Sequence, residues 1–381
     1  MEIIWIPALV FLIIRIGVAF LNLMTRPVLP AAAATPLTES VSVLIPARNE
    51  EKNLPGLLES LRQHPDPRVS LFLYNDHSTD ATASIMQEAA ALDTRMVLLP
   101  TVPLPPGWLG KSFACHQLAR AATGQWLLFL DADTRVRPEL LQSLLSRANE
   151  QKLQLLSLFP EQEMKTPGEQ MMVPVMHYLL LSLLPLPLVR LSKRPALAAA
   201  NGQCMFFEAA FYKQHSFHAG VKEVITEDIR IMQAVKRLGG RGEVRLGNGL
   251  IQCRMYGGYR EALQGFSKNF IAGFGNSLIL ASCYLWLLAP AFLFMPFGGH
   301  RLLWVAVVTG NLLLSCLISM ASRQPVWRNA ILYPLLIVSI FRIALLSAFK
   351  TLTHTGTWKD RPTNMVPVPN KEKKQKHRNR G

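Results

Sequence analysis

Cysteine and charge are both scarce in this sequence. The 381 residues include five cysteines, an odd number without any Cys-x-x-Cys pair, which argues against a disulfide framework or a structural zinc site and indicates a reducing compartment. Only 17% of the residues are charged, whereas 50% are hydrophobic. That balance excludes a disordered or fibrous chain, and the apolar excess lies in runs that are typical of membrane segments.

The first apolar run is long enough to cross a bilayer. Residues 3–24 are interrupted only by Arg15 and Asn22, and at about 1.5 Å per residue they span a hydrocarbon core of about 30 Å. A cleaved signal peptide is the alternative, because residues 31–34 are small, but no basic region precedes the run. The pattern favours a transmembrane anchor over residues 1–26.

Further apolar segments lie downstream. Three runs with at most one charge each predict transmembrane helices within residues 276–350, and these runs are 276–297, 302–322 and 329–349. The segment over residues 171–190 is equally apolar but contains three prolines, so it is not expected to form one continuous helix. We expect it to lie at the membrane interface.

The positive charge of the chain is concentrated at its C-terminus. Lys and Arg outnumber Asp and Glu by 40 to 25, a net charge of +15, and residues 351–381 alone carry eight basic and two acidic residues. This basic tail has no apolar period, so we expect it to be solvated. Beside transmembrane helices its expected partner is an anionic leaflet, and nucleic acid is not expected as a partner.

Residues 38–255 have the sequence pattern of an α/β domain. Short β-rich runs alternate with helical periods, and the predicted strands are residues 41–45, 69–74, 96–99 and 126–130. In an open α/β sheet, ligands bind beyond the carboxyl ends of the strands. Polar groups follow three of these ends, at residues 46–50, 75–76 and 131–133. An Asp after a strand is more often a turn or cap residue, but the joint placement at one edge favours a nucleotide site.

Paired carboxylates after the fourth strand indicate a cation site. Asp131 and Asp133, at positions i and i+2, suit a hard divalent cation that bridges the oxygens of a diphosphate. Lys111, at a helix start, is expected to add positive charge there, although such a lysine is often merely solvated. The Gly-x-x-x-x-Gly-Lys-Ser/Thr spacing is lacking, which excludes a P-loop.

A second acidic group begins a helix further along. Thr226 is a plausible N-cap, and the helix dipole by itself explains acids in the first turn, here Glu227 and Asp228. Upstream, Asn201-Gly-Gln203 precedes a strand-like run.

Together these pieces resemble the membrane-bound glycosyltransferases of family 2. The matching motifs are PARNE at 46–50, NDHSTD at 75–80, GK at 110–111, DAD at 131–133 and TED at 226–228. The resemblance implies a GT-A fold, a nucleotide-sugar donor, most simply a UDP-sugar, and Mg²⁺ or Mn²⁺. It implies donor-binding roles for Pro46, Arg48, Asn49, Glu50, Asp76, Lys111 and Asp131, with Asp76 at the nucleobase. It further implies Asp131 and Asp133 at the metal, and Asp228, with Glu227 beside it, as the catalytic base.

A finer likeness concerns the acceptor. The segments around Trp108, Asn201, 254–269 and 357–361 are similar to a bacterial subgroup containing carotenoid-acid (diaponeurosporenoate) glycosyltransferases. That likeness implies a lipid acceptor of carotenoid or terpenoid type. The expected acceptor or membrane-proximal residues are Asn201, Gln203, Arg254, Lys268, Trp358, Lys359 and Arg361.

One departure bears on the reaction. Processive members carry a Gln/Arg-x-x-Arg-Trp motif after the TED helix, and this chain lacks it, so single transfers are expected. The resemblance to family 2 further implies inversion at the anomeric carbon. Residues 256–275 are expected to form an interfacial helix instead.

Two alternatives remain open. Polyprenyl-phosphate or sphingoid-lipid sugar transferases share the catalytic domain, and Lys193 with Arg194 offers charge for a phosphate. A non-enzymatic transporter or scaffold is the other, although such a protein has no need of Asp76, Asp133 and Asp228 together. We expect the catalytic domain to face the cytoplasm, with residues 276–297 as a re-entrant segment.

Overall fold

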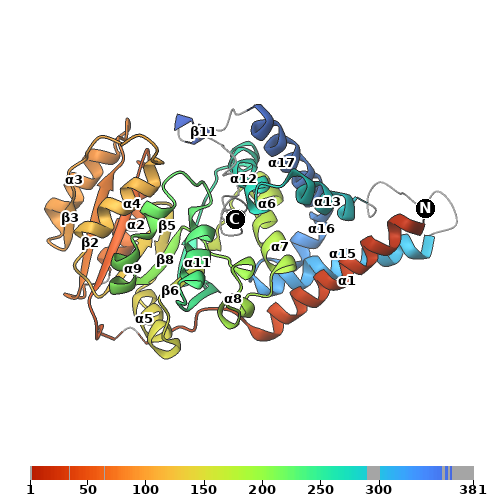
Figure 1. The fold of residues 1–381 in the computed structure, drawn as a ribbon, viewed down its shortest axis with the longest axis horizontal. Coiled ribbons are helices and arrows are strands. Elements are labelled where there is room, and N and C mark those ends of the chain that lie inside the picture. The colour runs from red at the N-terminus through yellow and green to blue at the C-terminus, as the bar shows by residue number, and fades with distance from the viewer. Residues whose placement is uncertain are drawn as a thin grey trace, which may run out of the picture.

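The protein combines an α/β domain with a bundle of apolar helices (Figure 1). The computed structural model describes residues 2–33, 35–63, 65–289, 301–353, 357–358 and 361–362. The α/β domain lies at one end of the molecule, and the helices that include α1 (Glu2–Thr25) and α15 (Arg301–Ala321) lie at the other.

A seven-stranded sheet forms the centre of the α/β domain. Its strand order is β3-β2-β1-β4-β8-β6-β9, in which β8 alone runs antiparallel to its two neighbours. The bounds are β1 Val41–Ala47, β2 Val69–Asn75, β3 Met96–Leu98, β4 Trp126–Leu130, β6 Leu155–Phe159, β8 Cys204–Glu208 and β9 Gly242–Leu246. The four predicted strands are confirmed, with the parallel register Val41↔Val69 and Val41↔Trp126. The predicted α/β class is therefore correct.

Helices cover both faces of this sheet. They are α2 Leu54–Arg62, α3 Thr82–Leu92, α4 Gly110–Ala121, α5 Leu140–Gln151, α9 Ala209–His215, α10 Phe217–Gly220 and α11 Glu227–Arg237. Successive strand residues point to opposite faces, so Val43 and Ile45 of β1 belong to one buried cluster and Leu44 to the other. A small second sheet, β5-β10-β7, lies beside the end of β4 and consists of β5 Thr134–Val136, β7 Glu161–Gln162 and β10 Ile251–Cys253.

A carboxylate stabilises the start of α3. The N-cap position is Ala81, which makes no side-chain cap bond. Asp80 instead accepts hydrogen bonds from the backbone N–H and hydroxyl of Thr82, at 3.0 and 2.6 Å. A carboxylate one residue before the cap therefore satisfies the helix start.

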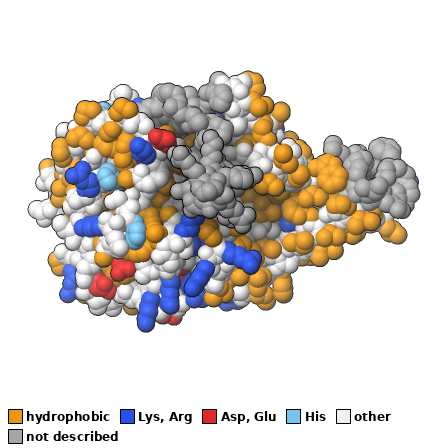
Figure 2. Space-filling model, in the orientation of Figure 1, with side chains coloured by type: hydrophobic (Ala, Val, Ile, Leu, Met, Phe, Trp, Pro, Cys, Tyr) orange, Lys and Arg blue, Asp and Glu red, His pale blue; other side chains and the backbone are white. Residues whose placement is uncertain are grey.

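Three described helices are long and apolar enough to cross a membrane. They are Ile6–Thr25 within α1, α15, and α17 (Tyr333–Thr353). Helices α12 (Tyr259–Gly273) and α13 (Leu278–Leu288) form a pair bent by 111°. The predicted run over 276–297 thus contributes the short α13, and residues 290–300 lie outside the described part. Figure 2 shows hydrophobic side chains gathered over this helical part, while Lys and Arg gather over the α/β domain.

The proline-rich segment is broken, as its composition predicts. It forms α6 (Pro167–Met172), α7 (Pro174–Leu183) and α8 (Pro187–Leu191), followed by the 3₁₀ turn Pro195–Leu197. Helix α7 packs against α1, α15 and α17. Its depth relative to a bilayer surface stays a prediction.

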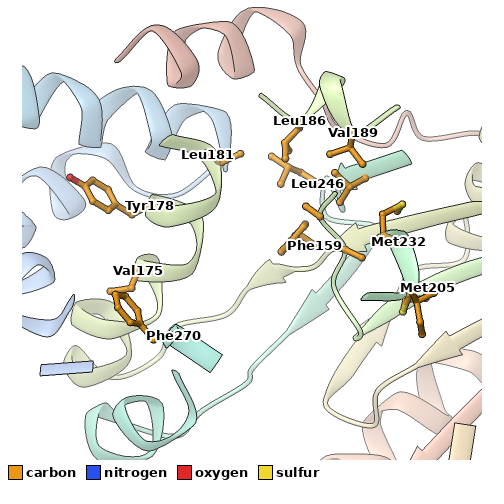
Figure 3. Packing of buried hydrophobic residues seen from close by; sticks show 14 of the residues in the cluster. Phe159, Val175, Tyr178, Leu181, Leu186, Val189, Met205, Met232, Leu246 and Phe270 are labelled. Atoms are coloured by element: carbon orange, nitrogen blue, oxygen red, sulfur yellow. The ribbon is translucent and has the colours of Figure 1, made fainter. Parts of the chain in front are cut away.

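The α/β domain and the helices share one apolar core. Figure 3 shows Tyr178 and Leu181 of α7 and Phe270 of α12 on one side, and Met205 of β8 and Met232 of α11 on the other. All five belong to a single buried cluster. The remaining described elements are α16 (Val326–Ile331) and the strand pair β11 (Thr357–Trp358) and β12 (Arg361–Pro362).

Candidate functional site

The loops that follow β1 and β2 are tied together at the carboxyl edge of the sheet. Arg48 donates from Nη1 to the carbonyl oxygens of Asp76 and His77, at 2.8 and 3.1 Å. Asn49 has a positive φ of 52°, and its Oδ1 accepts from the N–H of Thr79 at 2.9 Å. Asp76 is 2% exposed, and its own N–H donates to the carbonyl oxygen of Ala47. The PARNE and NDHSTD motifs thus form one interlocked surface.

Two further residues of the PARNE motif have local explanations. Pro46 lies in β1 beyond Leu44, where pairing with β4 ends, so its missing N–H costs no ladder bond with that strand. Glu50 receives a hydrogen bond from Asn53 at Oε2, and its N–H donates to the hydroxyl of Thr82. The negative charge of Glu50 raises the pKa of Asp133, so the Glu50 carboxylate lies near the DAD motif.

Lys111 lies between two acidic side chains. Its Nζ is 2.7 Å from Oδ2 of Asp131 and 3.5 Å from Oε1 of Glu227. Burial lowers the pKa of this lysine, but the two carboxylates outweigh burial and hold the pKa well above its usual value. Lys111 therefore stays charged and brings the GK, DAD and TED motifs into contact.

Asp133 is half-buried beside other acidic side chains. Burial raises the pKa of its carboxyl, and the charges of Asp131 and Glu50 raise it further. Its oxygens accept from Nε2 of Gln203 at 3.1 and 3.3 Å. The Gln203 amide is neutral, and the charge of Lys111 offsets that of the acidic group only in part, so a cation is favoured at this position.

Asp228 lies in the first turn of α11 and accepts two backbone hydrogen bonds. Gly202 donates to Oδ2 at 3.0 Å, and Ile229 donates to Oδ1 at 2.8 Å. Burial raises the pKa of Asp228. The pKa of Glu227 is raised by burial and by the neighbouring negative charge of Asp228. Thr226 occupies the N-cap position as predicted, but its side chain makes no capping bond.

These acids suit a hard divalent cation. Within the described residues no three His, Cys, Asp or Glu side chains form a ready-made metal cluster. Asp131 and Asp133 nevertheless offer carboxylate oxygens, the ligands that Mg²⁺ and Mn²⁺ prefer, and these two residues would hold such a cation. The donor set therefore fits the predicted metal.

The predicted acceptor residues lie in different places. Gln203 donates to Asp133 of the DAD motif, and Asn201 donates to the side chain of Gln203. Arg254 follows β10 and pairs with Glu169 of α6 at 2.9 Å, and Lys268 is half-buried on α12. Trp358 and Arg361 pair across β11 and β12, and Lys359 lies outside the described residues.

Sequence reasoning missed two site residues. A Cβ added to Gly202 would lie 3.2 Å from Nζ of Lys111 and 3.3 Å from Oε1 of Glu227, so this position favours glycine. Cys253, at the end of β10, accepts from Nε2 of Gln203 at 2.8 Å. Only its place directly before the motif that starts at Arg254 could have pointed to it.

This fold and edge-of-sheet acid site define a nucleotide-sugar transferase of GT-A type. Residues 42–212 match the family described as Glycosyl transferase family 2. Over 255 residues, 66% of each chain, the sequence is 30% identical to a 4,4'-diaponeurosporenoate glycosyltransferase of Staphylococcus haemolyticus (strain JCSC1435). A protein of the same name from Staphylococcus aureus (strain USA300) is 35% identical over 111 residues, 29% of this chain and 28% of its own. The chain belongs to glycosyl transferase family 2.

A solved structure has the same fold. The mannosyltransferase PcManGT from Pyrobaculum calidifontis, in complex with GDP-Man and Mn²⁺, superposes with a TM-score of 0.54 at 14% identity, covering 92% of this chain and 99% of that one. This likeness confirms the predicted GT-A fold. The matched regions span about two thirds of the Staphylococcus haemolyticus relative and a smaller part of the Staphylococcus aureus one.

Proposed function

We propose that this protein transfers a sugar from a nucleotide-diphosphate sugar to a lipid acceptor in the membrane, one sugar at a time and with inversion. Family membership supports sugar transfer. The GDP-Man complex of the solved mannosyltransferase supports a nucleotide-sugar donor, and the name of the staphylococcal relatives supports a carotenoid-like lipid.

The donor is bound at the carboxyl edge of the sheet. The tied loops after β1 and β2, including Arg48 and Asp76, form the nucleoside side of the site. Asp131 and Asp133 hold Mg²⁺ or Mn²⁺, which supplies positive charge for the leaving diphosphate. Lys111 stays protonated between Asp131 and Glu227 and adds a second positive charge on the same side.

Asp228 acts as the base. Its raised pKa makes it a better proton acceptor than an ordinary aspartate, and its two backbone hydrogen bonds fix its orientation. The acceptor oxygen attacks the anomeric carbon from the face opposite the diphosphate, so one displacement inverts the configuration. The proton of a hydroxyl acceptor goes to the carboxylate of Asp228.

One observation carries the proposal of a membrane acceptor. Strand β10 ends with Cys253 at the Gln203 amide, and the next residue, Arg254, pairs with Glu169 of α6. Helix α6 packs against α12 and α17. Tyr256 continues this path, because its ring contacts that of Phe266 in α12, with 5.2 Å between the ring centroids. Four consecutive residues thus connect the acid site to the apolar helices.

The topology follows from the same helices. With α1, α15 and α17 as spans and the bent α12–α13 pair re-entrant, the α/β domain and the basic tail lie on the same, cytoplasmic side. The 111° bend fits a re-entrant pair as well as a broken span, and the re-entrant form is the one that keeps the basic tail on the side of the α/β domain. External labelling of a cysteine placed at Arg380 in intact cells would contradict it.

The decisive experiment identifies the product lipid. Membranes from a host with and without the gene are incubated with radiolabelled UDP-sugars and GDP-sugars, and the lipid extract is separated. We expect a gene-dependent labelled lipid that Asp228→Asn lowers and whose anomeric configuration is opposite to that of the donor. Label only in water-soluble products, or retained configuration, would overturn the proposal.

The lability of the linkage separates the acceptor classes. A glycosyl ester of a lipid acid is cleaved by mild base, a glycosyl phosphate by mild acid, and a glycoside of a lipid alcohol by neither. The polyprenyl-phosphate alternative therefore predicts acid-labile label, whereas a carotenoid acid predicts base-labile label.

A further inference from the structure

The turn Asn201–Gly202–Gln203 touches acids of both halves of the site. It precedes β8, the one strand that runs antiparallel to β4, and the pairing Leu130↔Cys204 ends their ladder. One more backbone bond continues it, from the N–H of Asp131 to the carbonyl oxygen of Gln203 at 3.1 Å. The antiparallel insertion of β8 therefore brings its first residues to the edge where the parallel strands end.

The Gln203 side chain is fully engaged within the protein. It is 6% exposed, and its Nε2 donates to the Asp133 carboxylate and to Sγ of Cys253. Its Oε1 accepts from Nδ2 of Asn201 at 3.3 Å. Because both polar atoms of the amide already have protein partners, this side chain is poorly suited to bind an acceptor, the role that the sequence suggested.

Asn201 holds Gln203 in place. Its Oδ1 accepts from the N–H of Gln203 at 2.9 Å, and its own N–H donates to the hydroxyl of Ser157 at 2.7 Å. Ser157 is fully buried in β6, and its hydroxyl also donates to the carbonyl oxygen of Asn201. A chain of hydrogen bonds thus runs from Ser157 in β6 through Asn201 and Gln203 to Asp133.

We propose that Gln203 is a positioning residue for the metal site: its amide, held by Asn201, fixes the Asp133 carboxylate in the orientation that binds the divalent cation. This inference rests on the proposed function, in which Asp131 and Asp133 hold that cation. Partners that hydrogen-bond a metal-ligating side chain orient it, and their loss typically costs about 10- to 100-fold in metal affinity or activity. Without the amide, the Asp133 side chain rotates more freely, so metal binding must order it at a cost in conformational entropy.

The test measures Mn²⁺ binding directly. The full chain in detergent micelles is titrated with Mn²⁺ in the presence of UDP, and in a second series GDP, and free Mn²⁺ is followed by electron paramagnetic resonance. Gln203→Met keeps the length and apolar volume of the side chain but removes the donor. Asp133→Asn reports whether binding depends on the DAD motif.

A second glutamine gives a matched control. Gln162 lies in β7, directly opposite Cys253 of β10, and is 7% exposed, close to the 6% of Gln203. Its Nε2 donates to the carbonyl oxygen of Pro160. Gln162→Met therefore makes the same chemical change at the same burial in the adjoining sheet.

We expect Gln203→Met to raise the Mn²⁺ dissociation constant about 10- to 100-fold and Gln162→Met to leave it unchanged. In turnover assays the Mn²⁺ concentration for half-maximal rate should rise for Gln203→Met, while the rate at saturating Mn²⁺ is largely recovered. A merely structural defect is not rescued by metal. If Gln203→Met unfolds in thermal melts, Asn201→Ala, which releases the amide, should give the same shift in smaller measure.

The possible failures are distinct. Parental Mn²⁺ affinity in folded Gln203→Met, or equal losses in both glutamine variants, would overturn the positioning role while leaving the metal site intact. Mn²⁺ binding that Asp133→Asn does not weaken would overturn the proposed metal site itself, and the role of Gln203 with it.

Discussion

Replacement of Asp228 by Asn tests the assignment of the base and also separates two acceptor classes. The carboxylate accepts backbone hydrogen bonds at both oxygens, from Gly202 and Ile229. Asn keeps one acceptor oxygen, but its amide nitrogen then faces the second N–H. Leaving that part-buried donor unsatisfied costs at most about 1 to 3 kcal/mol of stability. The variant should therefore melt at a lower temperature but stay folded under assay conditions.

The expected loss of rate depends on the acceptor. A hydroxyl has a pKa far above 7 and must lose its proton as it attacks, so removal of the base should cost about 10² to 10⁴ in rate. At 1.36 kcal/mol per tenfold, this corresponds to about 3 to 5 kcal/mol of barrier. A carboxylic acid has a reference pKa of about 4 and arrives already ionised. For that acceptor Asp228 has no proton to remove, and the loss should be modest.

The assay compares single-turnover rates at saturating donor. Parental protein and Asp228→Asn are mixed with radiolabelled donor and one defined lipid acceptor, either an alcohol or an acid, after thermal melts and nucleotide binding show that the variant is intact. A larger loss with the alcohol than with the acid is expected. Transfer to a hydroxyl lipid at the parental rate by the folded, donor-binding variant would refute the assignment of Asp228 as the base.

Three further predictions concern metal, pH and the anchor. Asp133→Ala should abolish transfer without lowering the melting temperature much, because a polar edge-of-sheet residue adds little packing; full turnover in excess EDTA would contradict the metal requirement. Burial, with the charges of nearby basic groups, lowers the pKa of His218 from 6.5 to about 3. The unfolded chain therefore binds a proton at this residue that the folded chain does not, and His218 should lower the stability by up to about 1.4 kcal/mol per pH unit below about pH 6.5; His218→Asn should make the fall of the melting temperature with pH less steep in that window. Asn22, fully buried, bonds the carbonyls of Leu181 and Leu184 and the N–H of Leu186. Asn22→Leu leaves these backbone groups without a partner, at a cost of about 1 to 3 kcal/mol of stability for each, so it should lower the melting temperature in detergent. Asn269→Leu, at an exposed position of α12, should not lower it.

Local pattern was enough to predict the strands that carry the site. The run at residues 41–45 is apolar apart from Ser42 because β1 is covered on both faces, and such a run bounded by turn residues indicates a buried strand. The edge-of-sheet rule then places Asp76 and Asp131 close together, since β2, β1 and β4 are parallel neighbours. What the sequence indicates well is therefore the set of residues at one edge.

The pairing of strands that are distant in the chain could not be predicted from the sequence. Nothing in the run after Gln203 says that β8 inserts antiparallel between β4 and β6, and only that insertion brings Gln203 to Asp133. The contact of Cys253 with the amide depends in turn on the small sheet, whose three strands come from distant parts of the chain. Sequence spacing encodes local turns, whereas these contacts follow from the order of strands across the sheet.

The N-terminal helix α1 also contains polar residues whose partners could not be predicted from the sequence. In the sequence, Arg15 and Asn22 look like flaws in an apolar helix, yet polar residues in such helices usually face protein and bind partners there. Arg15 lies over the ring of Tyr178, 4.6 Å from its centroid, and donates to the hydroxyl of Ser182, while Asn22 satisfies the open backbone where α7 ends. Helix α1 is thus bonded to the segment that leads into the turn Asn201–Gln203, and buried residues from both parts form one cluster. A helix that only tethered a soluble domain would have no reason to share its core, so the fold joins the candidate site and the apolar helices into one packed unit.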